Sequence, residues 1–183
     1  MLRAPFKVVL DANVLYPFTL RDTLLRAAEA EFYQPYWSAE ILDEAKRNLI
    51  AKAQMTKDQA SRLFKAMVDL FPEANVTGHE SLIPSMTNHE KDRHVVAAAV
   101  KAGAQVIVTG NLKDFRSLPA GIEAQTPDEF LSNLFDLDPP GFVGLLRQQA
   151  ADLKKPPVTF DELLAKLTKP APTLVASVRS LSN

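Results

Sequence analysis

Apolar residues in this chain occur partly in short continuous runs and partly at helical spacing. The runs at residues 6–10 and 105–109 predict strands that are mostly buried. Shorter extended segments are expected at residues 33–37, 75–77 and 121–124. Apolar residues three or four positions apart predict helices between these strands, at residues 19–31, 39–52, 57–71, 88–102 and 127–134.

Several of these helices follow residues that favour a helix start. A serine, threonine or aspartate before a helix can accept a hydrogen bond from a free backbone N–H of its first turn. An acid or amide three residues later can return that bond and complete a capping box. The starts expected on this basis are Ser38 and the pairs Thr19–Asp22, Thr56–Gln59 and Thr87–Glu90.

Strands that alternate with helices predict an α/β fold, with a mostly parallel sheet covered by helices on both faces. The pattern changes after residue 136, because six of the 13 prolines fall between residues 139 and 172. Two short helices are expected there, at residues 142–153 and 159–167. They are too small to bury a core alone, so we expect them to pack on the body or on a partner chain. We therefore assign a domain to residues 1–135 and a helical C-terminal extension to residues 139–183.

Composition and charge exclude several classes of protein. The chain of 183 residues contains no cysteine, which excludes disulfides, thiol catalysis, iron–sulfur clusters and cysteine-ligated zinc. Residues 1–139 carry 15 Lys or Arg against 19 Asp or Glu, whereas residues 140–183 carry six against three. An acidic body argues against nucleic-acid binding by bulk charge. The apolar run at residues 8–10 is far too short for a spanning helix or a signal-peptide core, so a cytoplasmic protein without a membrane partner is expected.

Polar residues follow the two strongest predicted strands. Asp11 and Asn13 come directly after the first strand, and Thr109, Asn111 and Asp114 end or follow the strand at residues 105–109. Ligands of parallel α/β sheets gather at the carboxyl ends of the strands, so these side chains are candidates for a common site. Asp11 could instead be a turn or helix-cap residue, although no helix is expected for several residues after it.

Two further acids are predicted to point inward from helices. On a helix at residues 88–102, Asp92 falls within the apolar stripe formed by Val95, Val96 and Ala99. Such an aspartate needs a cation, a hydrogen-bond donor or a metal, and a structural salt bridge would also satisfy it. Glu44 lies at the margin of the apolar face of its helix. Glu40 and Asp43 point further away and are interpreted as first-turn acids that favour the helix dipole.

Four carboxylates, those of Asp11, Glu44, Asp92 and Asp114, are thus expected to converge at one end of the sheet. Their mutual repulsion requires neutralisation, and Mg²⁺ or Mn²⁺ suits a set of oxygen ligands. The histidines show no ligand spacing, and His89 and His94 are expected at the surface or beside a helix cap. Glycine-rich nucleotide motifs and a serine nucleophile motif are absent from the sequence, so no organic cofactor is expected.

Four segments together resemble the PIN-domain family, in its branch of VapC-like toxins from bacterial toxin–antitoxin pairs. They are VVLDANVL at residues 8–15, WSAEILDE at 37–44, DRHVVAAA at 92–99 and VTGNLKDF at 108–115. The resemblance covers roughly residues 5–135 in order. It implies a three-layer α/β/α fold and a metal-dependent endoribonuclease that acts on structured RNA such as tRNA. It also implies a small antitoxin partner, and members of this branch often form homodimers.

The resemblance also implies roles for individual residues. Asp11 would be the primary metal ligand, with Glu44 and Asp92 as the second and third acids, and Asn13 and Thr109 in support. Many PIN domains carry an aspartate where this chain has Asn111. Either Asp114 then completes the site, or a single metal ion binds tightly.

Two other functions compete with this interpretation. A phosphatase of the haloacid-dehalogenase kind also places an aspartate after its first strand, but it needs a second acid where this chain has Asn13. A binding module without catalysis would use the acids only in salt bridges, and Mg²⁺ would then leave its melting temperature unchanged.

Overall fold

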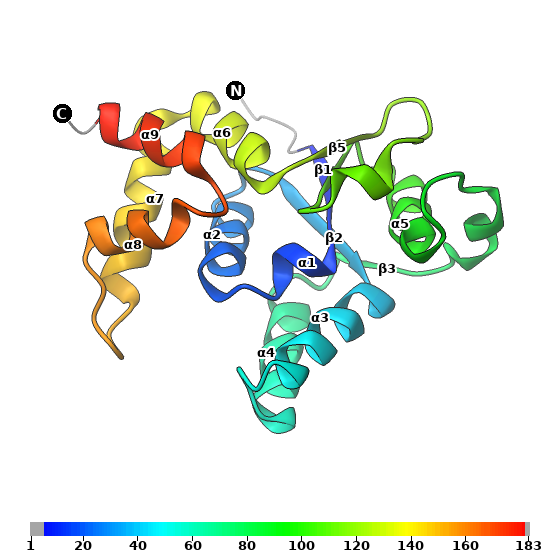
Figure 1. The fold of residues 1–183 in the computed structure, drawn as a ribbon, viewed down its shortest axis with the longest axis horizontal. Coiled ribbons are helices and arrows are strands. Elements are labelled where there is room, and N and C mark those ends of the chain that lie inside the picture. The colour runs from blue at the N-terminus through cyan, green and yellow to red at the C-terminus, as the bar shows by residue number, and fades with distance from the viewer. Residues whose placement is uncertain (1–5, 182–183) are drawn as a thin grey trace.

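A five-stranded sheet forms the centre of the computed structural model, which describes residues 6–181 (Figure 1). The strands lie in the order β3-β2-β1-β4-β5, and every neighbouring pair is parallel. The register aligns Leu10 with Val108, so the residues that follow the two strands emerge at the same edge. The strands are β1 (Lys7–Leu10), β2 (Gln34–Ser38), β3 (Asn75–Val76), β4 (Val106–Val108) and β5 (Glu123–Gln125).

Helices cover both faces of this sheet, which confirms the predicted three-layer α/β/α arrangement. On one side α5 (Arg93–Ala102) contacts β1 to β4, and on the other lie α1 (Ala12–Leu15) and α2 (Phe18–Glu29) (Figure 1). The helix α3 (Ala39–Ala51) continues directly from β2 and packs against α1 and α4 (Lys57–Leu70). Ser38 caps α3 and the Thr56–Gln59 capping box starts α4, as the sequence predicts.

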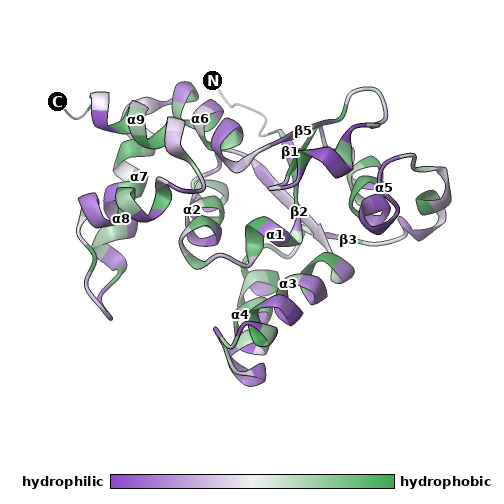
Figure 2. Cartoon of the chain, viewed as in Figure 1, coloured by the Kyte–Doolittle hydropathy of each residue, from purple (hydrophilic) through white to green (hydrophobic). Residues whose placement is uncertain are grey.

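Burial explains why the central elements form. Val8, Val9 and Leu10 of β1 are completely buried, and α5 is buried along residues 94–99. β2 is coloured as hydrophilic in Figure 2, yet its Trp37 and Ser38 are also fully buried. Among the described helices, none has the combination of length and hydropathy required to cross a bilayer.

Three 3-10 turns occur in the loops around the sheet: η1 (Glu80–Ser85), η2 (Glu90–Asp92) and η3 (Leu112–Phe115). Of these, η2 replaces part of a predicted helix. The helix predicted at residues 88–102 therefore begins only at Arg93, and the expected Thr87 cap is wrong. The Thr87 hydroxyl instead lies 2.8 Å from that of Ser117. The expected Thr19 cap is wrong as well, because α2 begins at Phe18 after Pro17, whose fixed φ suits a helix entry.

Four helices follow the sheet: α6 (Pro127–Leu137), α7 (Pro139–Asp152), α8 (Phe160–Leu167) and α9 (Pro172–Leu181). The Thr159–Glu162 capping box starts α8 as expected, whereas α9 lies beyond the helices that the sequence predicted. The helices pack on the body, since α7 and α8 contact α2 and α9 contacts α6.

Aromatic and polar contacts fix this packing. The ring of Phe142 in α7 meets Phe32 edge to face, with centroids 5.5 Å apart. In the same interface the Thr23 hydroxyl donates to Gln149 Oε1 over 3.0 Å, and both residues are completely buried. The Asp128 carboxylate of α6 accepts hydrogen bonds from backbone N–H groups of the first turn of α9.

We predict that Phe142→Ala lowers the free energy of unfolding by about 3–5 kcal/mol, because the ring is fully buried between α7 and the body. Urea denaturation followed by circular dichroism measures this change. Gln148→Ala is the control, since this exposed residue of α7 should cost no more than about 0.5 kcal/mol. A Phe142→Ala protein as stable as wild type would show that the docking of α7 contributes little.

Candidate metal centre

Asp11 lies at the carboxyl end of β1 and is buried, with 4% of its surface exposed. Its backbone N–H donates to the carbonyl of Val108, which continues the β1–β4 pairing by one residue. Its Oδ1 accepts from the N–H of Ala12 over 2.8 Å, so Asp11 is also the N-cap of α1. The expectation that no helix follows Asp11 closely is therefore wrong. The cap contact leaves the second carboxylate oxygen to face β4.

Asn13 and Thr109 hold that second oxygen. Thr109 Oγ1 donates to Asp11 Oδ2 over 2.9 Å, and Asn13 Nδ2 donates to the same atom over 3.0 Å. The amide oxygen of Asn13 in turn accepts from the N–H of Gly110 over 2.8 Å. The side chain of Asp11 is thus oriented from two neighbouring strand ends.

The pKa of Asp11 is raised to about 6. Burial is the main cause, and the negative charges of Asp92 and Glu44 raise it further. The hydrogen bonds from Thr109 and Ala12 act in the opposite direction. Three of the four acids predicted for the site therefore lie close enough to influence one another.

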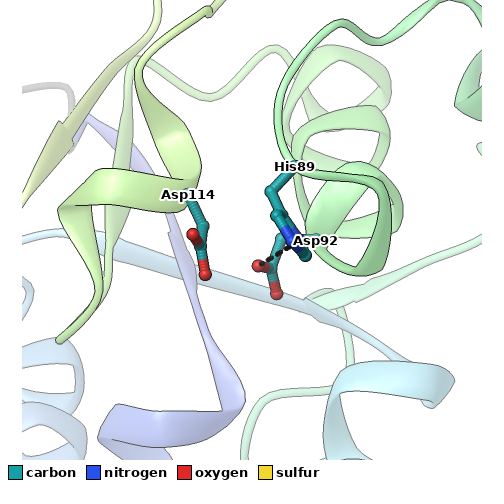
Figure 3. Close-up of side chains that lie close together, drawn as sticks. All are labelled: His89, Asp92 and Asp114. Carbon is teal, nitrogen blue, oxygen red and sulfur yellow. Dashed lines mark ion pairs between the residues drawn. The ribbon is translucent and has the colours of Figure 1, made fainter.

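Asp92 and Asp114 approach each other from two 3-10 turns, η2 and η3, and His89 lies beside them (Figure 3). One ligand atom from each of the three residues lies within 4.8 Å of the other two. His89 Nδ1 is 3.9 Å from Asp92 Oδ2. Burial raises the pKa of Asp92, and the charges of Asp114 and Glu44 add to this effect.

The position of Asp92 differs from the one predicted. Because α5 begins at Arg93, Asp92 is the last residue of η2 and does not belong to the apolar stripe of a longer helix. Its N–H donates to the carbonyl of His89, which closes the 3-10 turn. This turn places His89 and Asp92 on the same side, so the expectation that His89 has no ligand spacing is wrong. The two residues are three positions apart, a spacing that places side chains on the same face of a helical turn.

Asn111 contacts Asp114 directly. Its side-chain amide donates to Asp114 Oδ2, and its backbone N–H donates to Thr109 Oγ1 over 3.1 Å. The carbonyl of Asp114 accepts from the N–H of His89 over 3.1 Å, which joins η3 to η2. The carboxylate nearest to Asp92 and His89 on this side is thus that of Asp114, and Asn111 orients it.

The acids of α3 meet a buried histidine. His94 Nε2 lies 3.9 Å from Glu44 Oε2, and its Nδ1 lies 3.6 Å from Glu40 Oε2. His94 lies two residues after the N-cap Asp92, in agreement with the expectation of a residue beside a helix cap, but it is buried. Glu40 is an exposed first-turn acid as expected, and its carboxylate nevertheless reaches His94. His94 is 6% exposed because it precedes the fully buried segment of α5. Asp43 is exposed and makes no ion pair within residues 6–181.

This donor set fits a hard divalent cation. Four carboxylates would carry up to four negative charges, and burial together with neighbouring carboxylates raises the pKa values of Asp11 and Asp92. Carboxylate oxygens suit Mg²⁺ and Mn²⁺, whereas the imidazole of His89 is a donor that transition metals accept more readily. The partly exposed side of Asp92 and Asp114 leaves room for water or a ligand oxygen.

Comparison with known proteins adds independent information. Residues 127–180 match a family model described as the VapC50 C-terminal domain. Over 107 residues the chain is 40% identical to "Putative ribonuclease VapC50" of Mycobacterium tuberculosis, an alignment that covers 57% of this chain and 63% of that protein. The matched part therefore spans less than two thirds of the relative. Residues 7–113, more than half of the chain, match the PIN domain model, so this protein belongs to the PIN domain family.

Proposed function

We propose that this protein is a divalent-metal-dependent endoribonuclease, with Asp11, Glu44, Asp92 and Asp114 as its metal ligands and catalytic acids. The observation that supports it best is the raised pKa of Asp11 and of Asp92 in a PIN domain, to which the nearby charges of Glu44 and Asp114 contribute. The similarity to a protein named as a ribonuclease points to RNA as substrate. We also propose that it is the toxin of a toxin–antitoxin pair, with a small antitoxin as partner.

A bound Mg²⁺ or Mn²⁺ would supply Lewis-acid stabilisation of the charge that develops on a phosphodiester. Neighbouring residues orient the carboxylates that would bind the metal. Thr109 and Asn13 fix Asp11 Oδ2, and Asn111 fixes the carboxylate of Asp114. His94 lies between Glu40 and Glu44, 3.6 Å from a carboxylate oxygen of the first and 3.9 Å from one of the second. Oriented donors of this kind favour catalysis because they need little rearrangement during the reaction.

The phosphatase alternative has less support. It requires an acid at position 13 that can donate and accept a proton. Asn13 has an amide there, and both ends of that amide are engaged in hydrogen bonds to Asp11 and Gly110.

We predict that Asp92→Asn lowers RNA cleavage by orders of magnitude while the protein stays folded, since the substitution removes charge and keeps shape. Asp43→Asn is the matched control, because Asp43 is exposed on α3 and should retain full cleavage. Incubation with total RNA, with and without EDTA, followed by mapping of the cleaved ends, measures both. Normal cleavage by Asp92→Asn would contradict the proposed site.

Asn111→Asp is expected to lower the melting temperature in EDTA, because it places a second negative charge against Asp114. The same variant should show a larger Mn²⁺-dependent rise in melting temperature than wild type, since the added carboxylate strengthens cation binding. Thermal unfolding across a Mn²⁺ titration tests this. Equal rises in the two proteins would place residue 111 outside the influence of the metal.

The raised pKa of Asp11 predicts a pH-dependent stability in the metal-free protein. Between its ordinary pKa of 3.8 and the folded value of about 6, the folded state binds more protons than the unfolded state. The resulting stabilisation is complete below about pH 4 and is lost as the pH rises through about 6. Its full size is about 3 kcal/mol, at 1.36 kcal/mol per pKa unit.

The test compares wild type with Asp11→Asn in EDTA by urea denaturation at about pH 4.5 and about pH 7.5. The variant cannot ionise at this position, so its stability relative to wild type should rise with pH. The difference between the two proteins cancels the titration of other groups. A constant difference across this range would show that Asp11 has an ordinary pKa.

A further inference from the structure

A cleft of about 750 Å³ opens beside the acidic site. The start of α1 and α2 forms one wall, and residues Lys166–Pro170 at the end of α8 and the turn before α9 contribute to the other. Asn13 and Gly110 lie in the cleft. Asn13 also donates to Asp11 Oδ2, so the cleft begins one hydrogen bond away from the buried acid.

The charge of this cleft is opposite to that of the site. Among the described residues that line it none is acidic, and its charged side chains are Lys166 and Lys169. Three other clefts in the described structure each contain at least two carboxylates, such as Glu31 and Glu73 in one of them. Residues 1–139 carry a net negative charge, and both lysines of the cleft come from the C-terminal extension, residues 139–183, called here the tail.

Both lysines have their charge available. They are exposed, and neither takes part in an ion pair within residues 6–181. Glu162 lies one turn before Lys166 and attracts its charge weakly, while the Glu162 carboxylate is held by the backbone N–H of Thr159 in the capping box. The turn that carries Lys169 is held in place because Leu167 and Ala171 are completely buried.

An aromatic surface lies in the same cleft. Phe18 is 52% exposed, which is unusual for so large an apolar side chain, and the guanidinium of Arg21 lies 5.7 Å from its ring centroid. Tyr16 also lines the cleft, and Lys52 donates to its hydroxyl over 2.6 Å. Tyr16 is half-buried and Arg21 is buried, so Phe18 is the exposed ring of the pair. An exposed ring in one cleft with basic side chains is typical of surfaces that bind single-stranded nucleic acid.

We propose that this cleft, called here the tail cleft, binds single-stranded RNA on its way to the acidic site. Lys166 and Lys169 would contact phosphates, and Phe18 would stack on an unpaired base. The proposal rests on the proposed function, because it extends the substrate path from the same site. A duplex is disfavoured since its stacked bases present no free face to Phe18. The basic tail would offset the repulsion between the acidic body and the phosphate backbone.

Binding is measured separately from cleavage, in the full-length Asp92→Asn protein, by fluorescence anisotropy with a short fluorescein-labelled single-stranded RNA. We expect Lys166→Ala/Lys169→Ala to weaken binding about tenfold or more. Each lost phosphate contact on a single strand lowers the slope of log affinity against log salt by about 0.7, so the double variant should lose about 1.4.

The matched control is Lys154→Ala/Lys155→Ala. These lysines are exposed in the same tail, before α8, and do not line the tail cleft. The control removes the same charge, so it should keep the affinity and the salt slope of the parent protein. Phe18→Ala should weaken binding about 5- to 150-fold with an unchanged salt slope, because it removes stacking without removing charge.

Equal losses in the two double-lysine variants, no loss in either, or no RNA binding by the parent protein would overturn the proposal. Unchanged RNA binding in Lys166→Ala/Lys169→Ala would show that the tail cleft does not bind RNA and would favour a protein ligand there, such as an acidic segment of a partner. Cleavage of total RNA by wild type is scored separately. If wild type cleaves RNA and Lys166→Ala/Lys169→Ala binds RNA as well as the parent protein, the tail-cleft proposal is wrong and the proposed nuclease activity stands. If RNA binds at the tail cleft and wild type cleaves no RNA, the proposed nuclease activity is wrong and the binding site stands.

Discussion

Repulsion between carboxylates is the constraint around which this site is built. Asp11, Glu44 and Asp92 come from separate elements, and the charge of Glu44 raises the pKa of both Asp11 and Asp92 in addition to the larger effect of burial. The fold keeps them together because β1 and β4 pair in parallel and bring Asp11 against Thr109, whose hydroxyl stabilises the ionised form. Rigid strand ends and two short 3-10 turns hold the arrangement against this repulsion. A bound cation would neutralise these charges and so remove the unfavourable electrostatic energy of the site.

The tail completes the charge pattern of the molecule. The body alone concentrates negative charge at the carboxyl edge of the sheet, where a polyanion would be repelled. The α8 helix and the turn after it place positive charge on the opposite wall of a cleft that reaches the same edge. The division of the chain into residues 1–135 and 139–183 remains a prediction. The contacts of α7 and α8 with α2 show that the tail and the body share one interface.

Much of the fold could be predicted from sequence because it depends on local signals. Continuous apolar runs marked β1 and β4, and the side chains of Ser38, Thr56 and Thr159 marked the helix starts that they cap. The same reasoning failed where a feature depends on distant contacts. His94 meets Glu40 across two elements, and α1 begins at once after Asp11 because Ala12 can donate to that carboxylate. His89 and Asp92 are three positions apart, so a spacing argument that includes acids as well as histidines predicts their proximity, and only the 3-10 form of the turn depends on the fold.

The buried hydrogen bond between Thr23 and Gln149 has a consequence for how such chains can diverge. It is completely buried between α2 and α7, so loss of Thr23 leaves Gln149 Oε1 without solvent or its hydrogen bond. Replacing both residues by apolar ones of similar shape avoids that penalty. Changes at the two positions are therefore coupled, although 126 residues separate them in the sequence. The hydrogen bond therefore ties the divergence of the C-terminal extension to that of α2, because one of its partners lies in each.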